Sequence, residues 1–278
     1  MIIDKNYSLK KITTIGLGGC CKEYVCPSSI QELKEIIVDR NPLFIGNGSN
    51  TCFITDFYNR TVVNLKKMKK NISFDKNYIS CSSNVSCTKL ARYLHNNQIS
   101  GFEFLYGIPG TLGGAIYMNA GAFDKEIMTY VYSIDLINQD GQEYTLFNND
   151  LNYSYRASNI DKKSIITSVK FFNHALSFDD KLLDKLDIKR KKNQPINQLS
   201  CGCIFKNPNE DYASRLIETS NLKGMRVGGI YVSTKHSNYF INDGSGTFKD
   251  FLLLLKNVKD SVLKKHKVQL KEEVILIK

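Results

Sequence analysis

The sequence predicts an α+β protein with two lobes followed by a C-terminal domain. Short apolar segments typical of strands alternate with amphipathic helical segments over the 278 residues. Two glycine-rich segments lie about 60 residues apart, one in each predicted lobe. A long helical segment and a final apolar strand follow near the C-terminal end. We therefore expect divisions at 1–67, 68–178 and 179–278, with a connector helix over 179–194.

The first lobe has the pattern of strands separated by one helix. Ser29 and Glu32 form a capping-box pattern, and the apolar residues that follow fall on one helical face: Leu33, Ile36 and Ile37. Residues 66–77 are polar and basic and predict a linker. The strands expected in this lobe are 23–26, 43–45 and 61–65.

The second lobe and the C-terminal domain continue this alternation. Asp140-Gly141 predicts a hairpin turn between two strands of the second lobe. Its expected strands are 78–82, 130–137, 143–147 and 164–172, with a helix over 86–97. The C-terminal domain is expected to contain helices at 211–220 and 247–266 and strands at 226–232, 239–241 and 273–277. An apolar stripe on the second of these helices predicts core packing.

Residues 106–122 form the richer glycine segment, with five of the 18 glycines. Glycine permits positive φ and close approach of backbone amides to a ligand, and Pro109 stiffens the turn. Residues 113–119 are small or apolar and could begin a short helix, whose unpaired N–H groups and dipole would suit a diphosphate. A tight turn packed on a strand is the alternative interpretation.

A second glycine segment, Gly46-Asn-Gly-Ser-Asn50, directly follows the strand expected at 43–45. Asn-Gly between strands is by itself a hairpin signal. Ser49 and Asn50 add side-chain donors where a phosphate would lie. Two such loops indicate a dinucleotide held between two lobes. Neither loop has the glycine spacing of a nicotinamide-binding fold or of a Walker loop.

Composition excludes several classes of protein. A hydrophobic content of 42% and a charged content of 23% are ordinary for a soluble globular protein, and no apolar run approaches the roughly 20 residues of a membrane span. We find no signal peptide at the N-terminal end and expect a cytoplasmic protein. Eight cysteines without a Cys-x-x-Cys pair and four scattered histidines predict reduced thiols and no metal site.

The net charge of +11 raises the alternative of nucleic-acid binding. No stacking aromatic residues are interleaved with the basic runs at 66–70 and 189–192, and no nucleic-acid motif is present. We therefore expect no nucleic-acid partner. A positive field would still favour anionic small molecules such as nucleotide sugars and phosphorylated nicotinamide.

At the two glycine segments the chain resembles the UDP-N-acetylenolpyruvoylglucosamine reductases. The resemblance rests on Gly46-Asn-Gly-Ser-Asn50, Gly107-Ile-Pro-Gly-Thr-x-Gly-Gly-Ala and Asn119-Ala-Gly-Ala122, and it extends from about Leu9 to Ile277. It implies the FAD fold of the vanillyl-alcohol-oxidase type and a role in peptidoglycan precursor synthesis. The length and spacing resemble the shorter subtype, which lacks a tyrosine-bearing substrate lid.

The resemblance implies non-covalent FAD as cofactor and NADPH as co-substrate. FAD would pass a hydride from NADPH to an enolpyruvyl ether on a UDP-sugar. The glycine pair in 14–19 matches the family too, although a turn before the first strand would also explain it. The implied cofactor-binding residues are Gly46, Asn47, Gly48, Ser49, Asn50, Gly107, Ile108, Pro109, Gly110, Thr111, Gly113, Gly114, Asn119, Gly121 and Ala122.

Three segments resemble the catalytic motifs of the family. Tyr153-Ser-Tyr-Arg-Ala-Ser158 implies a catalytic Arg156, and Lys271-Glu-Glu-Val274 implies Glu273, with Glu272 as the alternative. Ser200-Cys-Gly-Cys-Ile-Phe-Lys-Asn-Pro208 implies a proton donor at Cys203, where the family usually has serine. A thiol is a stronger acid than a hydroxyl and can give a proton. Ser200 and Cys201 are the fallback donors.

The resemblance also implies substrate contacts at Asn207 and His236. Ile275 replaces an arginine that often follows the catalytic glutamate, so one substrate contact is missing from the pattern. We expect a monomer. The rival predictions are another flavoprotein of the same fold, such as a sugar or alcohol oxidase, and a basic protein whose glycine loops are only turns.

Overall fold

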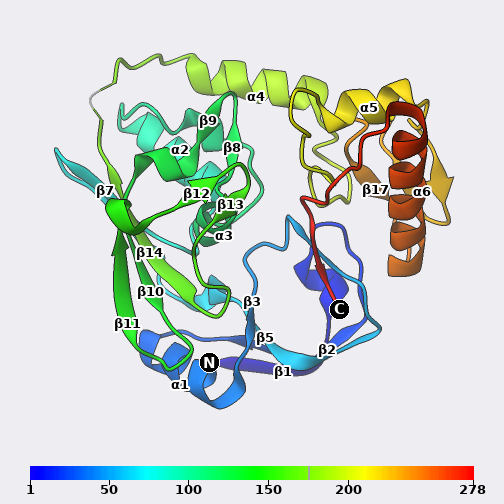
Figure 1. The fold of residues 1–278 in the computed structure, drawn as a ribbon. Coiled ribbons are helices and arrows are strands. Elements are labelled where there is room, and N and C mark those ends of the chain that lie inside the picture. Colours follow the sequence, from blue (N-terminus) through cyan, green and yellow to red (C-terminus); the bar gives the residue numbers. More distant parts are fainter. Residues whose placement is uncertain (175) are drawn as a thin grey trace. The chain divides into compact units, whose positions relative to one another are not determined.

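The computed structural model describes residues 1–174 and 176–278 and divides them into two compact units (Figure 1). Unit 1 comprises Met1–Lys5, Glu23–Asn47 and Arg60–Arg190, and unit 2 comprises Asn6–Lys22, Gly48–Asn59 and Lys191–Lys278. The chain passes between the units inside strands β1 (Ile2–Ser8), β2 (Cys20–Cys26) and β5 (Phe57–Val63), inside helix α4 (Leu182–Asn193), and within the first glycine segment. The division into 1–67, 68–178 and 179–278 stays a prediction.

Strands β1, β2 and β5 join β3 (Leu43–Phe44) in a four-stranded sheet with the order β1-β2-β5-β3. Helix α1 (Ile30–Arg40) forms where the capping pattern predicts it, because the Ser29 side chain accepts from the Glu32 amide. The reciprocal bond goes to Ser28, whose amide and hydroxyl both donate to the Glu32 carboxylate. The apolar face of α1 packs in a cluster with β2, β5 and Ile137, as the sequence pattern predicts.

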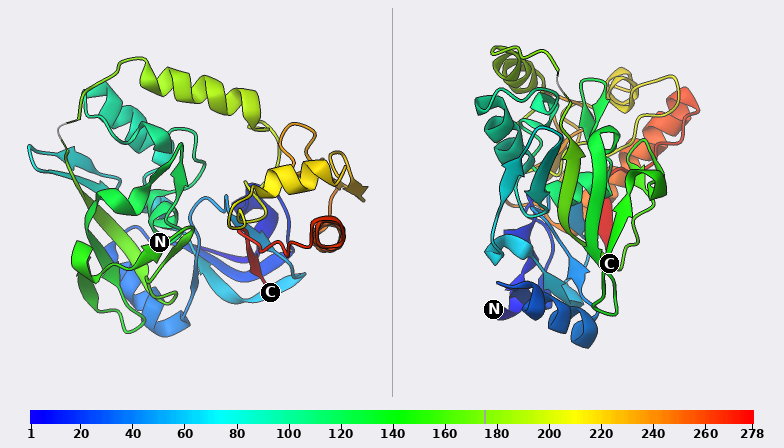
Figure 2. Two further views of the ribbon diagram at one scale, coloured as in Figure 1. Left: turned by 45° about the horizontal axis from the view of Figure 1, so that its top comes forward. Right: turned by 90° about the vertical axis from the view of Figure 1, so that its left-hand side faces the viewer.

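Unit 1 is built on an antiparallel sheet of five strands. In spatial order these are β11 (Glu143–Phe147), β10 (Val131–Ile137), β14 (Ile165–Phe172), β7 (Tyr78–Ser82) and β6 (Ile72–Phe74), which run alongside one another in Figure 2. Helices α2 (Cys87–Asn96) and α3 (Leu112–Tyr117) pack against this sheet and close the main core of the unit (Figure 1). The hairpin expected at Asp140-Gly141 is confirmed, with Gly141 at φ +77°.

Strand β6 lies inside the segment that the sequence analysis assigns to a linker, so that part of the prediction is wrong. Ile72, Ser73 and Phe74 pair with β7, and two of the three side chains are exposed. The strand is held by backbone pairing at a sheet edge, and its side chains therefore show no buried pattern that a sequence could reveal.

Two short hairpins and five 3-10 turns connect the larger elements. The hairpins are β8 (Gly121–Ala122) with β9 (Lys125–Glu126), and β12 (Tyr153–Ser154) with β13 (Ala157–Ser158). The 3-10 turns are η1 (Leu9–Ile12), η2 (Leu65–Lys67), η3 (Glu103–Leu105), η4 (Ile127–Tyr130) and η5 (Asn148–Asp150). The first hairpin contains Gly121 and Ala122 and the second contains Arg156, all of which are expected site residues.

Unit 2 contains the antiparallel sheet β15 (Arg226–Val227), β16 (Ile230–Val232) and β17 (Phe240–Asn242). Helices α5 (Ala213–Thr219) and α6 (Phe248–His266) share its core, and the apolar stripe of α6 is buried there as expected. The strand expected at 226–232 is a hairpin instead, because Gly228 at φ +52° turns the chain between β15 and β16. β4 (Thr51–Phe53) pairs in parallel with β18 (Ile275–Ile277).

Within the described residues, no helix has both the length and the apolar character needed to cross a membrane.

Candidate active site

The two glycine segments touch each other inside unit 1. The Asn47 side-chain amide donates to the Pro109 carbonyl at 2.8 Å. A Cβ atom added to Gly46 would overlap the Thr111 hydroxyl oxygen. Asn64 also contacts the first segment, because its side-chain amide donates to the Gly46 carbonyl at 2.7 Å. No local pattern in the sequence marks Asn64, because its partner lies 18 residues away and is a backbone group.

The backbone amides of these segments provide the donors that an anion would need. Among the described residues, none of the five amides from Gly46 to Asn50 donates a hydrogen bond. In the second segment the same is true of Gly110 and Thr111 in the described part of the chain. Successive backbone amides without an acceptor are typical of anion-binding loops, and diphosphate binding by these amides stays a prediction.

The start of α3 does not offer the unpaired amides that the sequence analysis expects. The Leu112 amide donates to Val85, the Gly113 amide donates to Ser83, and the Gly114 amide reaches the Thr111 hydroxyl at 3.5 Å. This prediction is wrong because the turn at 83–85, between β7 and α2, supplies acceptors to the first turn of α3. The donors for a diphosphate are therefore the loop amides that precede α3.

The asparagine side chains of the first segment contact other parts of the chain, and donation by Ser49 and Asn50 to a phosphate stays a prediction. The Asn47 amide is bound to Pro109, and the Asn50 amide donates to the Glu273 carbonyl at 3.1 Å within unit 2. Both asparagines therefore spend side-chain donors on other parts of the chain. The sequence could not reveal this, because each acceptor is a distant backbone carbonyl.

The glycines of the second segment separate into two groups. Gly107 has φ +80° and faces the Arg190 side chain, Gly113 faces Ser83 with only 3.1 Å to its Cβ, and Gly121 faces the Lys125 carbonyl. Packing within the protein explains these three. Gly114 is different, because its nearest neighbour would be the Thr111 hydroxyl at an ordinary 3.6 Å. Glycine weakens a helix, so a glycine at this position needs a reason other than packing. We infer that a ligand occupies the space that a side chain would fill, and that this ligand is FAD.

Arg156 lies in the turn of the β12–β13 hairpin with φ +55°, a conformation rare for a residue with a long side chain. Its guanidinium donates to the Gly121 carbonyl at 3.0 Å and approaches the Asn119 carbonyl at 3.5 Å. Arg156 and the Asn119–Ala122 segment, which the resemblance assigns to catalysis and to cofactor binding, are therefore neighbours. A strained backbone at such a position is typical of functional sites.

Asn119 is completely buried, and its side chain is satisfied within unit 1. It donates to Glu126 and to the Ser154 carbonyl and accepts from the Met128 amide. These bonds tie the Arg156 hairpin to the β8–β9 hairpin. A contact of Asn119 with the cofactor stays a prediction.

In unit 2, one hydrogen-bonded cluster joins the first glycine segment to the segment that carries Cys203. The Thr14 amide donates to the Gly48 carbonyl at 3.1 Å, and the Thr14 hydroxyl donates to the Ser200 carbonyl at 2.6 Å. The glycines at 18 and 19 pack closely on Phe53 and Asp56, so the turn interpretation explains them.

The structure distinguishes Cys203 from its fallback Cys201. Cys201 is fully buried, and burial raises the pKa of its thiol well above the usual range. Cys203 is partly exposed and pairs across a backbone bridge with Tyr239. Of these two residues, only Cys203 is partly exposed, and its role as proton donor stays a prediction.

The two neighbouring glutamates, Glu272 and Glu273, make different contacts. The Glu272 carboxylate pairs with Lys259 of α6 at 2.7 Å. The Glu273 amide donates to the Ile204 carbonyl at 2.8 Å, and its carbonyl accepts from Asn50. Both glutamates lie beside the Cys203 segment, since Glu272 pairs with Phe205 across a backbone bridge, and the catalytic role of Glu273 stays a prediction.

The two expected substrate contacts also lie in unit 2. The Asn207 side-chain oxygen accepts from the Ala213 amide at 3.1 Å and so caps α5, which leaves its amide nitrogen for a ligand. The His236 ring packs edge-on against Tyr239 with 4.9 Å between centroids. Burial lowers the pKa of His236, with a smaller contribution from Lys223, so the ring is neutral near pH 7.

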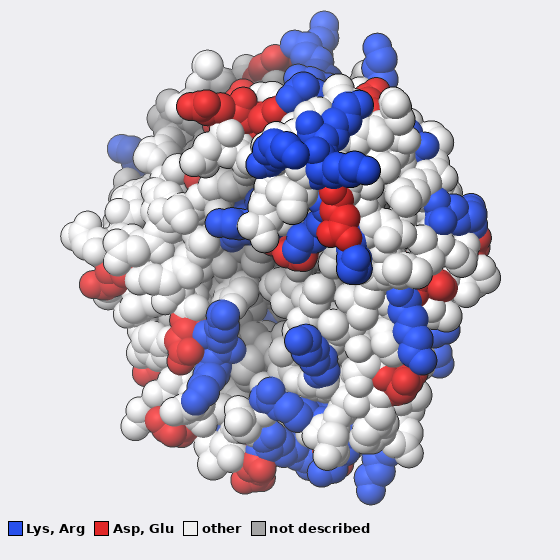
Figure 3. All heavy atoms as spheres, turned by 45° about the vertical axis from the view of Figure 1, so that its right-hand side comes forward, with Lys and Arg blue, Asp and Glu red and all other residues white. Residues whose placement is uncertain are grey.

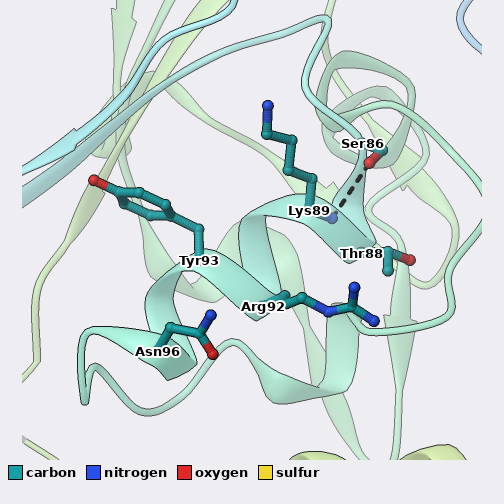
Figure 4. A pocket seen from close by; sticks show the side chains of 6 residues that line it. All are labelled: Ser86, Thr88, Lys89, Arg92, Tyr93 and Asn96. Atoms are coloured by element: carbon teal, nitrogen blue, oxygen red, sulfur yellow. Dashed lines mark hydrogen bonds between the residues drawn. The ribbon is translucent and has the colours of Figure 1, made fainter.

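A pocket on α2 was not expected from the sequence. It is lined by Ser86, Thr88, Lys89, Arg92, Tyr93 and Asn96, all on or next to one face of the helix (Figure 4). It adjoins the second glycine segment, because the Gly107 amide donates to Thr88 and Arg92 donates to the Tyr106 hydroxyl.

Charge is distributed over the surface. On the face drawn in Figure 3, Lys and Arg side chains occur at many separate places with Asp and Glu among them. Among the described residues, no group of three or more His, Cys, Asp or Glu side chains could hold a metal ion.

Comparison with known proteins agrees with this geometry. A model of an FAD-binding domain matches residues 22–181, and a model of the C-terminal domain of UDP-N-acetylenolpyruvoylglucosamine reductase matches residues 194–277. Curated proteins named UDP-N-acetylenolpyruvoylglucosamine reductase include one from Fusobacterium nucleatum, 32% identical with full coverage of both chains. Another, from Aquifex aeolicus, is 35% identical and covers 100% of this chain and 96% of its own length.

A solved structure is similar over the whole chain. The crystal structure of UDP-N-acetylenolpyruvylglucosamine reductase (MurB) from Thermus caldophilus superposes with a TM-score of 0.84, at 28% sequence identity and full coverage of both chains. The α+β fold with an FAD-binding domain is thereby confirmed. The loop amides, the space at Gly114 and these full-length matches lead to one conclusion: the chain belongs to the UDP-N-acetylenolpyruvoylglucosamine reductase family.

Proposed function

We propose that this chain is an FAD enzyme that uses NADPH to reduce the enolpyruvyl ether of UDP-N-acetylglucosamine to UDP-N-acetylmuramate, a step of peptidoglycan precursor synthesis. FAD, when bound, would carry the hydride from NADPH to the terminal carbon of the enolpyruvyl group. The undonated amides of the two glycine segments would hold its diphosphate. A reducing, cytoplasmic setting would suit a chain with eight cysteines and no Cys-x-x-Cys pair.

Three residues would act on the substrate. Hydride addition leaves negative charge on the neighbouring carbon and the carboxylate, and a cation such as Arg156 would stabilise it. Cys203 would then donate a proton to that carbon. Glu273 would assist from the neighbouring segment, to which its amide is bound. Asn207 and His236 would contact the substrate, with the neutral His236 ring able to accept or donate a hydrogen bond.

The observation that carries this proposal is the arrangement around Ile204 and Asn50. Within unit 2, the Glu273 amide donates to the carbonyl of Ile204, the neighbour of the partly exposed Cys203, and the Asn50 side chain at the end of the first glycine segment donates to the Glu273 carbonyl. A proton donor, a carboxylate and a diphosphate-binding loop are the parts that this reduction needs. The monomeric state stays a prediction.

The test is NADPH oxidation by the purified protein, followed with and without the enolpyruvyl UDP-sugar. We expect a yellow protein whose NADPH consumption depends on the sugar. Rapid oxygen consumption without NADPH would instead identify an oxidase of the same fold. A colourless protein that does not bind added FAD would refute the proposal.

A further inference from the structure

Asn50 links the end of the first glycine segment to the strand that carries Glu273. Its side-chain amide donates to the Glu273 carbonyl at 3.1 Å, and its own carbonyl accepts from the Ile275 amide at 2.9 Å. The parallel pairing of β4 and β18 begins one residue later, with Thr51 opposite Ile275. The Asn50 side chain thus extends this pairing two residues further toward Glu273.

The backbone of Glu273 is fixed on both sides. Its amide donates to the Ile204 carbonyl at 2.8 Å, and its carbonyl is held by Asn50. Ile204 follows Cys203 directly and is itself held by the Asn238 carbonyl at 2.9 Å. With both peptide groups of Glu273 fixed, the direction of its Cα–Cβ bond, and hence the starting point of the carboxylate, is set.

We propose that Asn50 is a positioning residue for Glu273, acting through the bond from its side-chain amide to the Glu273 carbonyl. The inference rests on the proposed function, because it assigns Asn50 a role only if Glu273 acts on the substrate. The bond to Glu273 uses one of the two N–H groups of the side-chain amide that the sequence pattern assigns to a phosphate. The backbone amides of the same segment remain for the diphosphate. One short segment would therefore place both the cofactor and the glutamate.

The first test compares Asn50→Ala with Asn47→Ala, a matched change in the same segment. Asn47 holds the second glycine segment through Pro109, so its loss should weaken binding of FAD to the apo-protein, measured by fluorescence titration, by about tenfold. Asn50→Ala should leave FAD affinity and flavin reduction by NADPH within about twofold of the wild type. It should slow reoxidation of the reduced enzyme by the enolpyruvyl sugar by about tenfold to a hundredfold.

The second test is a double-mutant cycle with Glu273→Gln. If Asn50 acts through Glu273, Asn50→Ala should slow reoxidation little further when Glu273→Gln is already present. Additive losses in the double variant would overturn the inference, as would a loss of FAD affinity like that of Asn47→Ala. Wild-type reoxidation by Asn50→Ala would also overturn it.

One result separates this inference from the proposed function. If Glu273→Gln alone reoxidises at the normal rate, the catalytic role of Glu273 fails, and the role of Asn50 fails with it. If Glu273→Gln is slow but Asn50→Ala is normal, only the positioning role fails. Asn50→Ser, which keeps a small polar side chain but is too short to replace the amide, serves if Asn50→Ala does not fold.

Discussion

Gly114→Ala should stabilise the apo-protein and weaken its binding of FAD, two effects of opposite sign. Gly114 lies in the first turn of α3 without positive φ, and an added Cβ would have its nearest contact at 3.6 Å. Replacing glycine by alanine inside a helix is worth about 0.5–1 kcal/mol. If FAD occupies this space, the methyl group should cost about 1–3 kcal/mol of binding, roughly tenfold or more in Kd.

Urea unfolding of the apo-protein measures the first effect, and FAD fluorescence titration measures the second. Gly113→Ala is the matched control, because its Cβ would come within 3.1 Å of the Ser83 Cβ and should destabilise the apo-protein itself. Unchanged FAD affinity in a stabilised Gly114→Ala protein would refute the reasoning that a ligand requires glycine there. Destabilised apo-protein would show that the space is not empty of protein atoms.

The remaining predictions concern the loops and the thiols. Gly46→Ala should weaken FAD binding by about tenfold, and Thr111→Ala should restore most of it in titrations of the double variant, because the nearest remaining atom, the Thr111 Cβ, would be 3.4 Å away. Cys203→Ala should abolish product formation while NADPH still reduces the flavin, and Cys203→Ser should keep turnover; full turnover by Cys203→Ala would remove the thiol from the mechanism. Burial raises the pKa of Cys52 and Cys87 from 9.0 to about 12. The unfolded chain ionises these thiols first, so the stability they contribute is complete below pH 9 and falls by about 1.4 kcal/mol per thiol per pH unit above it. Urea unfolding at pH 8 and pH 10 checks this, and Cys52→Ala should reduce the difference; an equal fall in Cys52→Ala would contradict it.

The long elements of the fold could be predicted because their patterns are local. The capped helix α1, the striped helix α6 and the hairpin at Gly141 each follow from residues close together in the chain. Strand β6 could not, because it has three residues and two exposed side chains, and the hairpin at Gly228 could not, because its strands have only two and three residues. Residue 175 lies outside the described part of the chain.

In the candidate site, too, local motifs could be recognised from the sequence and long-range contacts could not. The identities of Cys203 and Glu273 come from motif resemblance and stay predictions, and the structure adds that the fallback Cys201 is fully buried. The hydrogen bonds of Asn50 join residues 223 positions apart and leave no trace in local sequence. The prediction that the amides at the start of α3 are unpaired is wrong for the same reason. These amides donate to carbonyl groups on a separate segment.

Anaerobic mixing of the reduced protein with the enolpyruvyl UDP-sugar, followed by mass spectrometry of the sugar, tests the central claim most directly. The account predicts that flavin absorbance returns and that the sugar gains two hydrogens, one as hydride and one as a proton. Unchanged sugar with the flavin still reduced would contradict it.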